Sequence, residues 1–135
     1  MKGLTHAQTD MLLAEQLVTE AAELGEKGAP IYGGLCHSFP VLVRTCGLCQ
    51  ALAFHKAKAS SGSPDRAAAH GRLLAHIGRI LGAGDDPLHA VRNAPAAEYM
   101  LHTRRVLAAW IYFKRFAESI LNVSGAGDAE ESSNG

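Results

Sequence analysis

Apolar residues recur every three or four positions along this 135-residue chain, and that spacing constrains the fold more than any other feature. Residues three and four apart share one face of an α-helix, whereas a half-buried strand needs strict alternation of apolar and polar residues. No such alternating run stands out between the glycines and prolines that punctuate the chain. Alanine is abundant and aromatic residues make up 6%, which favours close helix–helix packing. We therefore expect an all-α fold.

Capping residues mark the first predicted helix. Thr5 and Gln8 have the spacing of a capping box, so a helix should begin there. Gly25 and Gly28 should end it, and the dipeptide at 29–30, which ends in proline, should be a connection.

The segment 32–58 carries the next apolar pattern. Pro40 predicts a bend or a first-turn position, and Gly47 should separate two helices. Phe54 is among the apolar residues of the second helix, which should fade where a linker of serine and glycine, 60–63, begins.

Three more helices are predicted after this linker. The serine and proline at 63–64 are typical of a helix start, and Gly82 should stop that helix. The pair at 86–87 should start a short helix, and Pro95 should open the last and longest one, which runs to about residue 122. The sequence thus predicts a compact bundle of about six helices.

This bundle should form a single domain, residues 1–122, followed by a flexible acidic tail, residues 123–135. No run approaches the roughly 20 apolar residues that a membrane span needs. Residues 1–10 lack the pattern of a signal peptide. We expect a cytoplasmic protein that makes no contact with a membrane and whose cysteines are reduced.

Cys46 and Cys49 form a C-x-x-C pair, a spacing that lets two thiolates share one zinc ion or form a redox disulfide. Cys36 and His37 are the adjacent residues that could complete a zinc site. Redox motifs of this kind usually follow a strand, and no strand is predicted. We favour small buried residues without a metal or cofactor. A small zinc or thiol-redox helical protein that uses Cys36, Cys46 and Cys49 is the alternative.

The other candidate motifs favour structural roles. The seven histidines form no H-x-x-x-H or H-E-x-x-H pair, so we expect them to be scattered over surface or half-buried positions. Asp86 precedes Pro87 and is better explained as a helix cap than as a metal ligand. There is no Walker-type loop and no G-x-S-x-G motif. We predict no catalytic residues and no enzyme activity.

The charges balance, with 13 acids and 13 lysines or arginines, but they are unevenly spread. Acids dominate residues 1–34, bases dominate residues 35–122, and the tail is acidic again. This distribution indicates two kinds of partner. One alternative is a generic helical adaptor whose acidic first helix, with Glu15, Glu20 and Glu23, docks on a basic partner.

Residues 35–54, LCHSFPVLVRTCGLCQALAF, resemble the signature of a known family, the small helical subunit of the type III-B CRISPR effector called the Cmr complex. Cys46 stands where that family commonly has asparagine, and Cys49 where it has small residues, which weakens the metal and redox interpretations. The matching positions are Gly47, Leu48, Gln50, Leu52, Ala53 and Phe54.

The resemblance implies a non-catalytic structural subunit of an RNA-guided, RNA-targeting complex involved in antiviral defence. Several copies would stack into a short filament beside the subunits that hold the guide RNA, and other subunits would cleave the target RNA. The expected partners are other Cmr subunits, further copies of this chain and the backbone of the guide RNA–target RNA pair. Basic side chains on rigid helices can follow phosphates without reading bases. The residues predicted to contact RNA are Arg44, Lys56, Lys58, Arg72, Arg104, Arg105 and Lys114.

Two residues of the same stretch have a physical interpretation of their own. Gly47 should permit a tight turn between helices. Gln50 should tie that turn to a neighbouring backbone through hydrogen bonds, a structural role.

Overall fold

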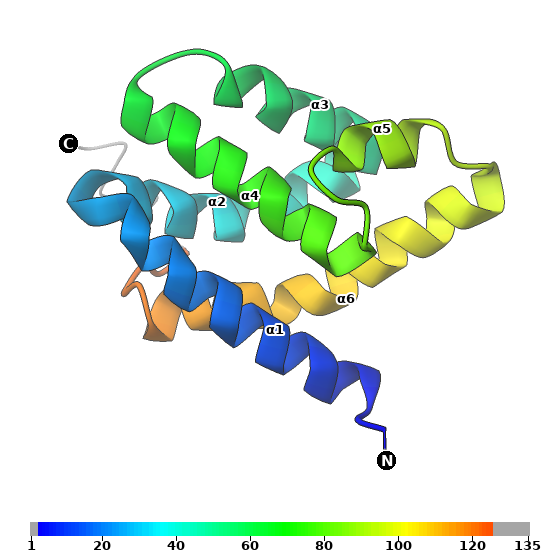
Figure 1. Ribbon diagram of the computed structural model, residues 1–135, viewed down its shortest axis with the longest axis horizontal. Helices are drawn as coiled ribbons and strands as arrows, with labels where there is room; N and C mark the ends of the chain where they lie inside the picture. Colours follow the sequence, from blue (N-terminus) through cyan, green and yellow to red (C-terminus); the bar gives the residue numbers. More distant parts are fainter. Residues whose placement is uncertain (1–2, 126–135) are drawn as a thin grey trace.

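The computed structural model describes residues 3–125, and these form six α-helices and one short 3₁₀ helix without a strand (Figure 1). The prediction of an all-α bundle is confirmed, and α6 is the longest helix, at 24 residues. Residues 126–135, most of the predicted tail, lie outside the described residues. The elements are α1 (His6–Ala21), η1 (Ala22–Leu24), α2 (Gly25–Cys46), α3 (Leu48–Ala59), α4 (Pro64–Leu81), α5 (Pro87–Arg92) and α6 (Ala96–Ser119).

Most predicted helix starts are confirmed. Thr5 and Gln8 form the complete capping box of α1. Ser63 caps α4 by accepting a hydrogen bond from the Arg66 N–H. Asp86 caps α5 by accepting from the His89 N–H at 3.1 Å. These caps are local, so the sequence alone carries the signal for them.

The predicted connection at 29–30 is wrong, because α2 begins at Gly25 and continues through Pro30 and Pro40. Gly25 has a φ of 85°, a backbone conformation that glycine adopts without strain and that lets the chain turn directly into α2. Gly28 accordingly lies inside α2 rather than at the end of α1. Pro30 lies in the second turn of the helix, so the carbonyl of residue 26 also lacks its usual backbone donor.

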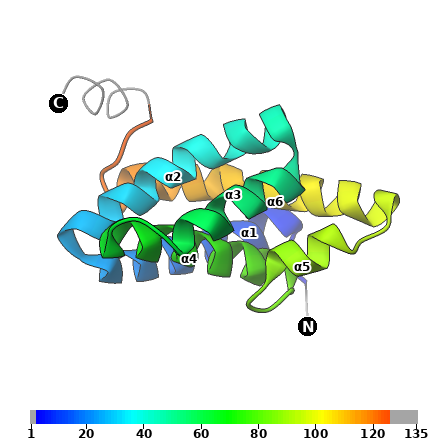
Figure 2. The ribbon, with the colours of Figure 1, turned by 90° about the horizontal axis from the view of Figure 1, so that it is seen from above.

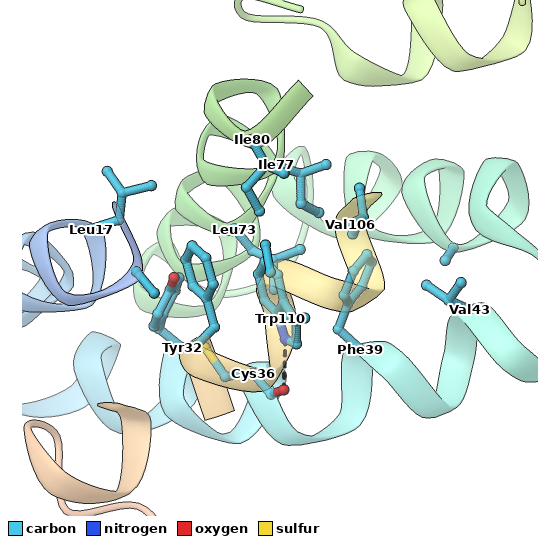
Figure 3. Close-up of a cluster of buried hydrophobic side chains, with 14 of the residues drawn as sticks. Leu17, Tyr32, Cys36, Phe39, Val43, Leu73, Ile77, Ile80, Val106 and Trp110 are labelled. Atoms are coloured by element: carbon cyan, nitrogen blue, oxygen red, sulfur yellow. Dashed lines mark hydrogen bonds between the residues drawn. The ribbon is translucent and has the colours of Figure 1, made fainter. Parts of the chain in front are cut away.

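Pro40 lies deep inside α2, and the fold compensates for the hydrogen bond that it cannot make. In a regular helix the N–H of residue 40 would donate to the carbonyl of residue 36. Trp110 Nε1 donates to the Cys36 carbonyl instead, at 2.8 Å (Figure 3). A long-range contact from α6 thus makes a proline tolerable in the interior of α2.

The core lies where α2, α4 and α6 meet (Figure 3). The Trp110 ring stacks on Phe113, with 4.3 Å between their centroids, and packs against Phe39 at 4.9 Å. Leu73 and Ile77 of α4 face these rings and are fully buried. Such rings dominate the apolar area that the fold removes from water.

The remaining elements wrap this core (Figures 1 and 2). Helix α1 packs along α6, and α3 packs along α4. After α6 the chain returns to α2, where Val123 is buried against Gly33 and its carbonyl accepts a 2.8 Å hydrogen bond from His37 Nε2. The packed domain therefore extends past residue 122 to Val123. Within the described residues, no helix combines the length and apolar character needed to cross a membrane.

Candidate nucleic-acid interface

The basic residues predicted to contact RNA lie on α2, α3, α4 and α6. Their position on helices gives them fixed starting points for contacts with a phosphate backbone. In the structure some of these side chains are held by contacts within the fold. The others are exposed and remain available to a partner.

Arg44 belongs to the available group. It is exposed in the last turn of α2, where a positive charge also complements the helix dipole. The turn that follows is held in place. Gly47 has a φ of 89°, and the Cys49 N–H donates to Tyr99 Oη at 2.9 Å. Arg44 is thus displayed beside a turn that α6 fixes.

The structure of this turn tests the predictions made for Gly47 and Gln50. The prediction that Gly47 permits a tight turn is confirmed by its positive φ. The prediction for Gln50 is wrong, because its side chain is exposed and makes no hydrogen bond among residues 3–125. Tyr99 ties down the turn instead. A tyrosine hydroxyl usually finds a partner when its ring packs on a core, but the sequence does not reveal which one.

Lys56 and Lys58 are exposed near the end of α3. Lys56 Nζ lies 3.3 Å from Asp86 Oδ2, and both side chains are about half exposed, at 54% and 50%. Such a surface pair contributes little and can exchange for another anion. Lys58 Nζ lies 5.6 Å from the centroid of the Phe54 ring. Phe54 itself is 44% exposed, although it is one of the apolar residues that the sequence pattern groups in this helix.

Arg72 and Arg105 are held by the fold. Arg72 Nη1 donates to the Glu20 carbonyl at 3.1 Å and lies 3.5 Å from a Glu23 carboxylate oxygen. Arg105 Nη1 lies 2.6 Å from Asp10 Oδ1, and the Asp10 side chain is only 4% exposed. Arg72 therefore links α4 to α1, and Arg105 links α6 to α1. The function proposed below therefore rests on the other five predicted residues.

Arg104 and Lys114 are exposed on α6 and take part in none of the ion pairs found within residues 3–125. Arg66, Arg79, Arg92 and Arg115 are also exposed. None of these four is in the predicted set, although the excess of bases on residues 35–122 was a signal for them.

Three histidines are buried, contrary to the expectation of scattered surface or half-buried positions. His55 Nδ1 and His70 Nδ1 are 2.8 Å apart, and His76 Nδ1 lies 2.6 Å from Tyr32 Oη. Burial lowers the pKa of His55 to about 4, with a smaller contribution from His70. Burial, with Arg72 and Arg79 nearby, lowers the pKa of His76 to about 3. Both imidazoles are therefore neutral at pH 7.

The cysteines do not converge on one point. Cys36 is fully buried, where burial raises the pKa of its thiol, whereas Cys46 is exposed and Cys49 is half-buried. Only Cys36 fits the expectation of a small buried residue. Among the described residues, no three histidine, cysteine or acidic side chains are grouped so that they could share a metal ion. The donor set of a zinc site is thus missing from this part of the chain.

An open groove runs between α1 and α4, next to the turn after α4. Glu20, Glu23 and Asp85 contribute acids to its lining, and Arg72 and Arg79 contribute bases. The lining contains no serine, threonine, cysteine or lysine that could act as a nucleophile. Its mixed charge suits ionic contact with another protein surface.

Comparison with known proteins connects this chain to one family. The model of a family described as CRISPR-associated protein (Cas_Cmr5) matches residues 6–120. A protein of Thermus thermophilus, named CRISPR system Cmr subunit Cmr5, is 37% identical over 119 residues, which are 87% of this chain and 96% of that protein.

The fold is similar as well. The crystal structure of a CRISPR-associated Cmr5 family protein from Thermus thermophilus superposes with a TM-score of 0.71 at 36% sequence identity. The match covers 87% of this chain and 98% of the other. The likeness therefore extends over nearly the whole helical bundle.

Proposed function

Because this chain belongs to the Cas_Cmr5 family of CRISPR-associated proteins, we propose that it is a non-catalytic structural subunit of an RNA-guided Cmr effector complex. The family identification made from residues 35–54 is confirmed. The observation that carries the proposal is the match over nearly the whole bundle to a protein named as a Cmr subunit. We assign no catalytic residue to the chain, so cleavage of RNA belongs to other subunits.

In this proposal several copies stack into a short filament beside the subunits that hold the guide RNA. The surface of α1 and α6 supports this part. These two helices cross and pack against each other (Figure 1) and expose large aliphatic side chains that a second protein surface would cover. The residues concerned are Met11, Leu12, Met100, Leu101 and Ile111. Exposed acids on α1, such as Glu15, would meet basic residues of the next copy.

The second part of the proposal is contact with the RNA backbone. Arg44, Lys58, Arg104 and Lys114 are exposed on helices and have no acidic partner within residues 3–125. Lys56 joins them because its pair with Asp86 is exposed to solvent. These side chains would contact phosphates without reading sequence, which suits a complex in which base pairing supplies specificity.

The test measures binding of single-stranded RNA to the full chain as a function of salt. We expect weak binding whose logarithm falls linearly with the logarithm of salt concentration. The triple variant Arg44→Ala/Lys58→Ala/Arg104→Ala should bind more weakly and with a shallower slope, by roughly 0.7 for each phosphate contact removed. Arg92→Ala, which removes an exposed arginine outside the predicted set, is the matched control.

Two outcomes of this binding experiment would contradict the proposed RNA contact. If the triple variant and Arg92→Ala reduce binding equally, the RNA contacts do not lie where we assign them. If the wild-type chain shows no salt-dependent binding, alone or within the complex, RNA contact is not its role.

A further inference from the structure

We propose that Phe54, together with Lys58, forms a stacking site for one unpaired base of single-stranded RNA. This inference rests on the proposed function, because it adds an aromatic contact with a base to contacts with the backbone. Phe54 differs from the other exposed large apolar side chains of residues 3–125, since it is the sole aromatic among them. The others are aliphatic and suit a protein contact, whereas an aromatic face suits a base.

The Phe54 ring is held in a fixed orientation. Its centroid lies 5.1 Å from that of His55 and 6.1 Å from that of His70, with interplanar angles of 79° and 76°. These two imidazoles are buried and joined through their Nδ1 atoms at 2.8 Å. The histidine pair thus supports the ring from the protein side while 44% of Phe54 remains exposed. A preorganised ring loses little conformational entropy when a base stacks on it.

Lys58 places a positive charge at this ring. Lys58 follows Phe54 by one helical turn, and its Nζ lies 5.6 Å from the ring centroid. Lys58 and Arg66 are both close enough to His70 that their charges, after burial, lower its pKa. A base stacked on Phe54 would carry its phosphate toward Lys58. Lys58 can leave the ring for that phosphate because its contact with the ring is at the surface and weak.

The nature of the partner follows from this combination. A protein surface that covered Phe54 would also have to neutralise Lys58, whereas a nucleotide supplies an aromatic face and a negative charge in one unit. Sequence preference is not expected, since every base has a face that can stack.

The experiment compares Phe54→Leu with Phe54→Tyr in the full chain, using single-stranded RNA and the same RNA with abasic positions. Phe54→Leu keeps apolar bulk but removes the ring, so we expect affinity for the intact RNA to fall roughly five- to 150-fold. Its salt dependence should be unchanged, since stacking releases no counterions. Phe54→Tyr should bind as the wild type does, and abasic RNA should bind the wild type and Phe54→Leu equally.

Leu4→Ala is the control for loss of an exposed apolar side chain outside the proposed contacts, and it should leave RNA affinity unchanged. If Phe54→Leu binds intact RNA as tightly as the wild type, the stacking site is refuted, even where Lys58→Ala weakens binding. If Phe54→Leu instead loses only its recovery with other subunits, Phe54 contacts protein. If the charge variants have no effect either, the proposed RNA contact fails together with the stacking site.

Discussion

Arg105 Nη1 lies 2.6 Å from Asp10 Oδ1, and this ion pair joins the middle of α6 to the first turns of α1. Arg104, the preceding residue, is exposed and has no acidic partner in the part of the chain described here. Neighbouring arginines therefore have different tasks. Arg105 joins two helices of the bundle, and Arg104 is available for the RNA contact that we propose.

The first prediction separates these tasks. Arg105→Met leaves the Asp10 carboxylate buried without its partner, so the free energy of unfolding should fall by about 2–4 kcal/mol in urea denaturation. Arg104→Met should change stability by no more than about 0.5 kcal/mol but should weaken RNA binding. Equal stability of the two variants would contradict the structural role of Arg105.

The second prediction concerns the hydrogen bond from Trp110 Nε1 to the Cys36 carbonyl, at 2.8 Å. Trp110→Phe removes the donor and some buried volume, and should cost about 2–4 kcal/mol in a chemical denaturation experiment. Pro40→Ala restores a backbone N–H that can donate to the same carbonyl. The double variant should therefore lose about 1 kcal/mol less than the sum of the single effects. Strict additivity would show that the carbonyl is satisfied in another way.

The third prediction uses two adjacent glycines of α2. A Cβ at residue 33 would lie 2.6 Å from Val123 Cγ2, whereas a Cβ at residue 34 meets nothing within 4 Å. Gly33→Ala should destabilise the protein by about 1–3 kcal/mol, because Val123 must move out of its site. Gly34→Ala should stabilise it by about 0.5–1 kcal/mol, as alanine does in an exposed helix interior. Thermal melts of both variants decide this, and a destabilised Gly34→Ala would count against the position of α2.

The fourth prediction is acid sensitivity. Burial holds the pKa of His55 at about 4 and that of His76 at about 3, against 6.5 for the unperturbed side chain. Below pH 6.5 these two histidines are protonated in the unfolded chain but stay neutral in the folded chain. The free energy of unfolding therefore falls as the pH falls. Each histidine should cost on the order of 3 kcal/mol by pH 4. Urea midpoints between pH 7 and pH 4 measure this slope.

A matched variant identifies the origin of that slope. His76→Gln cannot be protonated, so its stability, although lower at pH 7, should depend less on pH than that of the wild type. If the two proteins lose stability in parallel between pH 6.5 and pH 4, the buried histidines are not the cause.

The features that the sequence could predict are those encoded locally. The caps at Thr5, Ser63 and Asp86 and the turn at Gly47 depend on residues a few positions apart, and all four are present in the structure. The continuous α2 could not be predicted, because a proline in a helix interior depends on a distant donor such as Trp110.

The candidate site was predictable only as a set of charges. Which arginines are available depends on pairs far apart in the sequence, such as Arg105 with Asp10. The exposure of Phe54 depends in the same way on how α3 packs against α4, since a helical pattern alone does not say which apolar residues of the helix stay exposed.

The central claim is that this chain is a subunit of an RNA-guided Cmr complex, and purification of that complex tests it most directly. A tagged chain, co-expressed with the other effector subunits and a guide RNA, should recover all of them in fixed stoichiometry, with more than one copy of itself. Recovery of the tagged chain alone, folded and without subunits or guide RNA, would contradict the account.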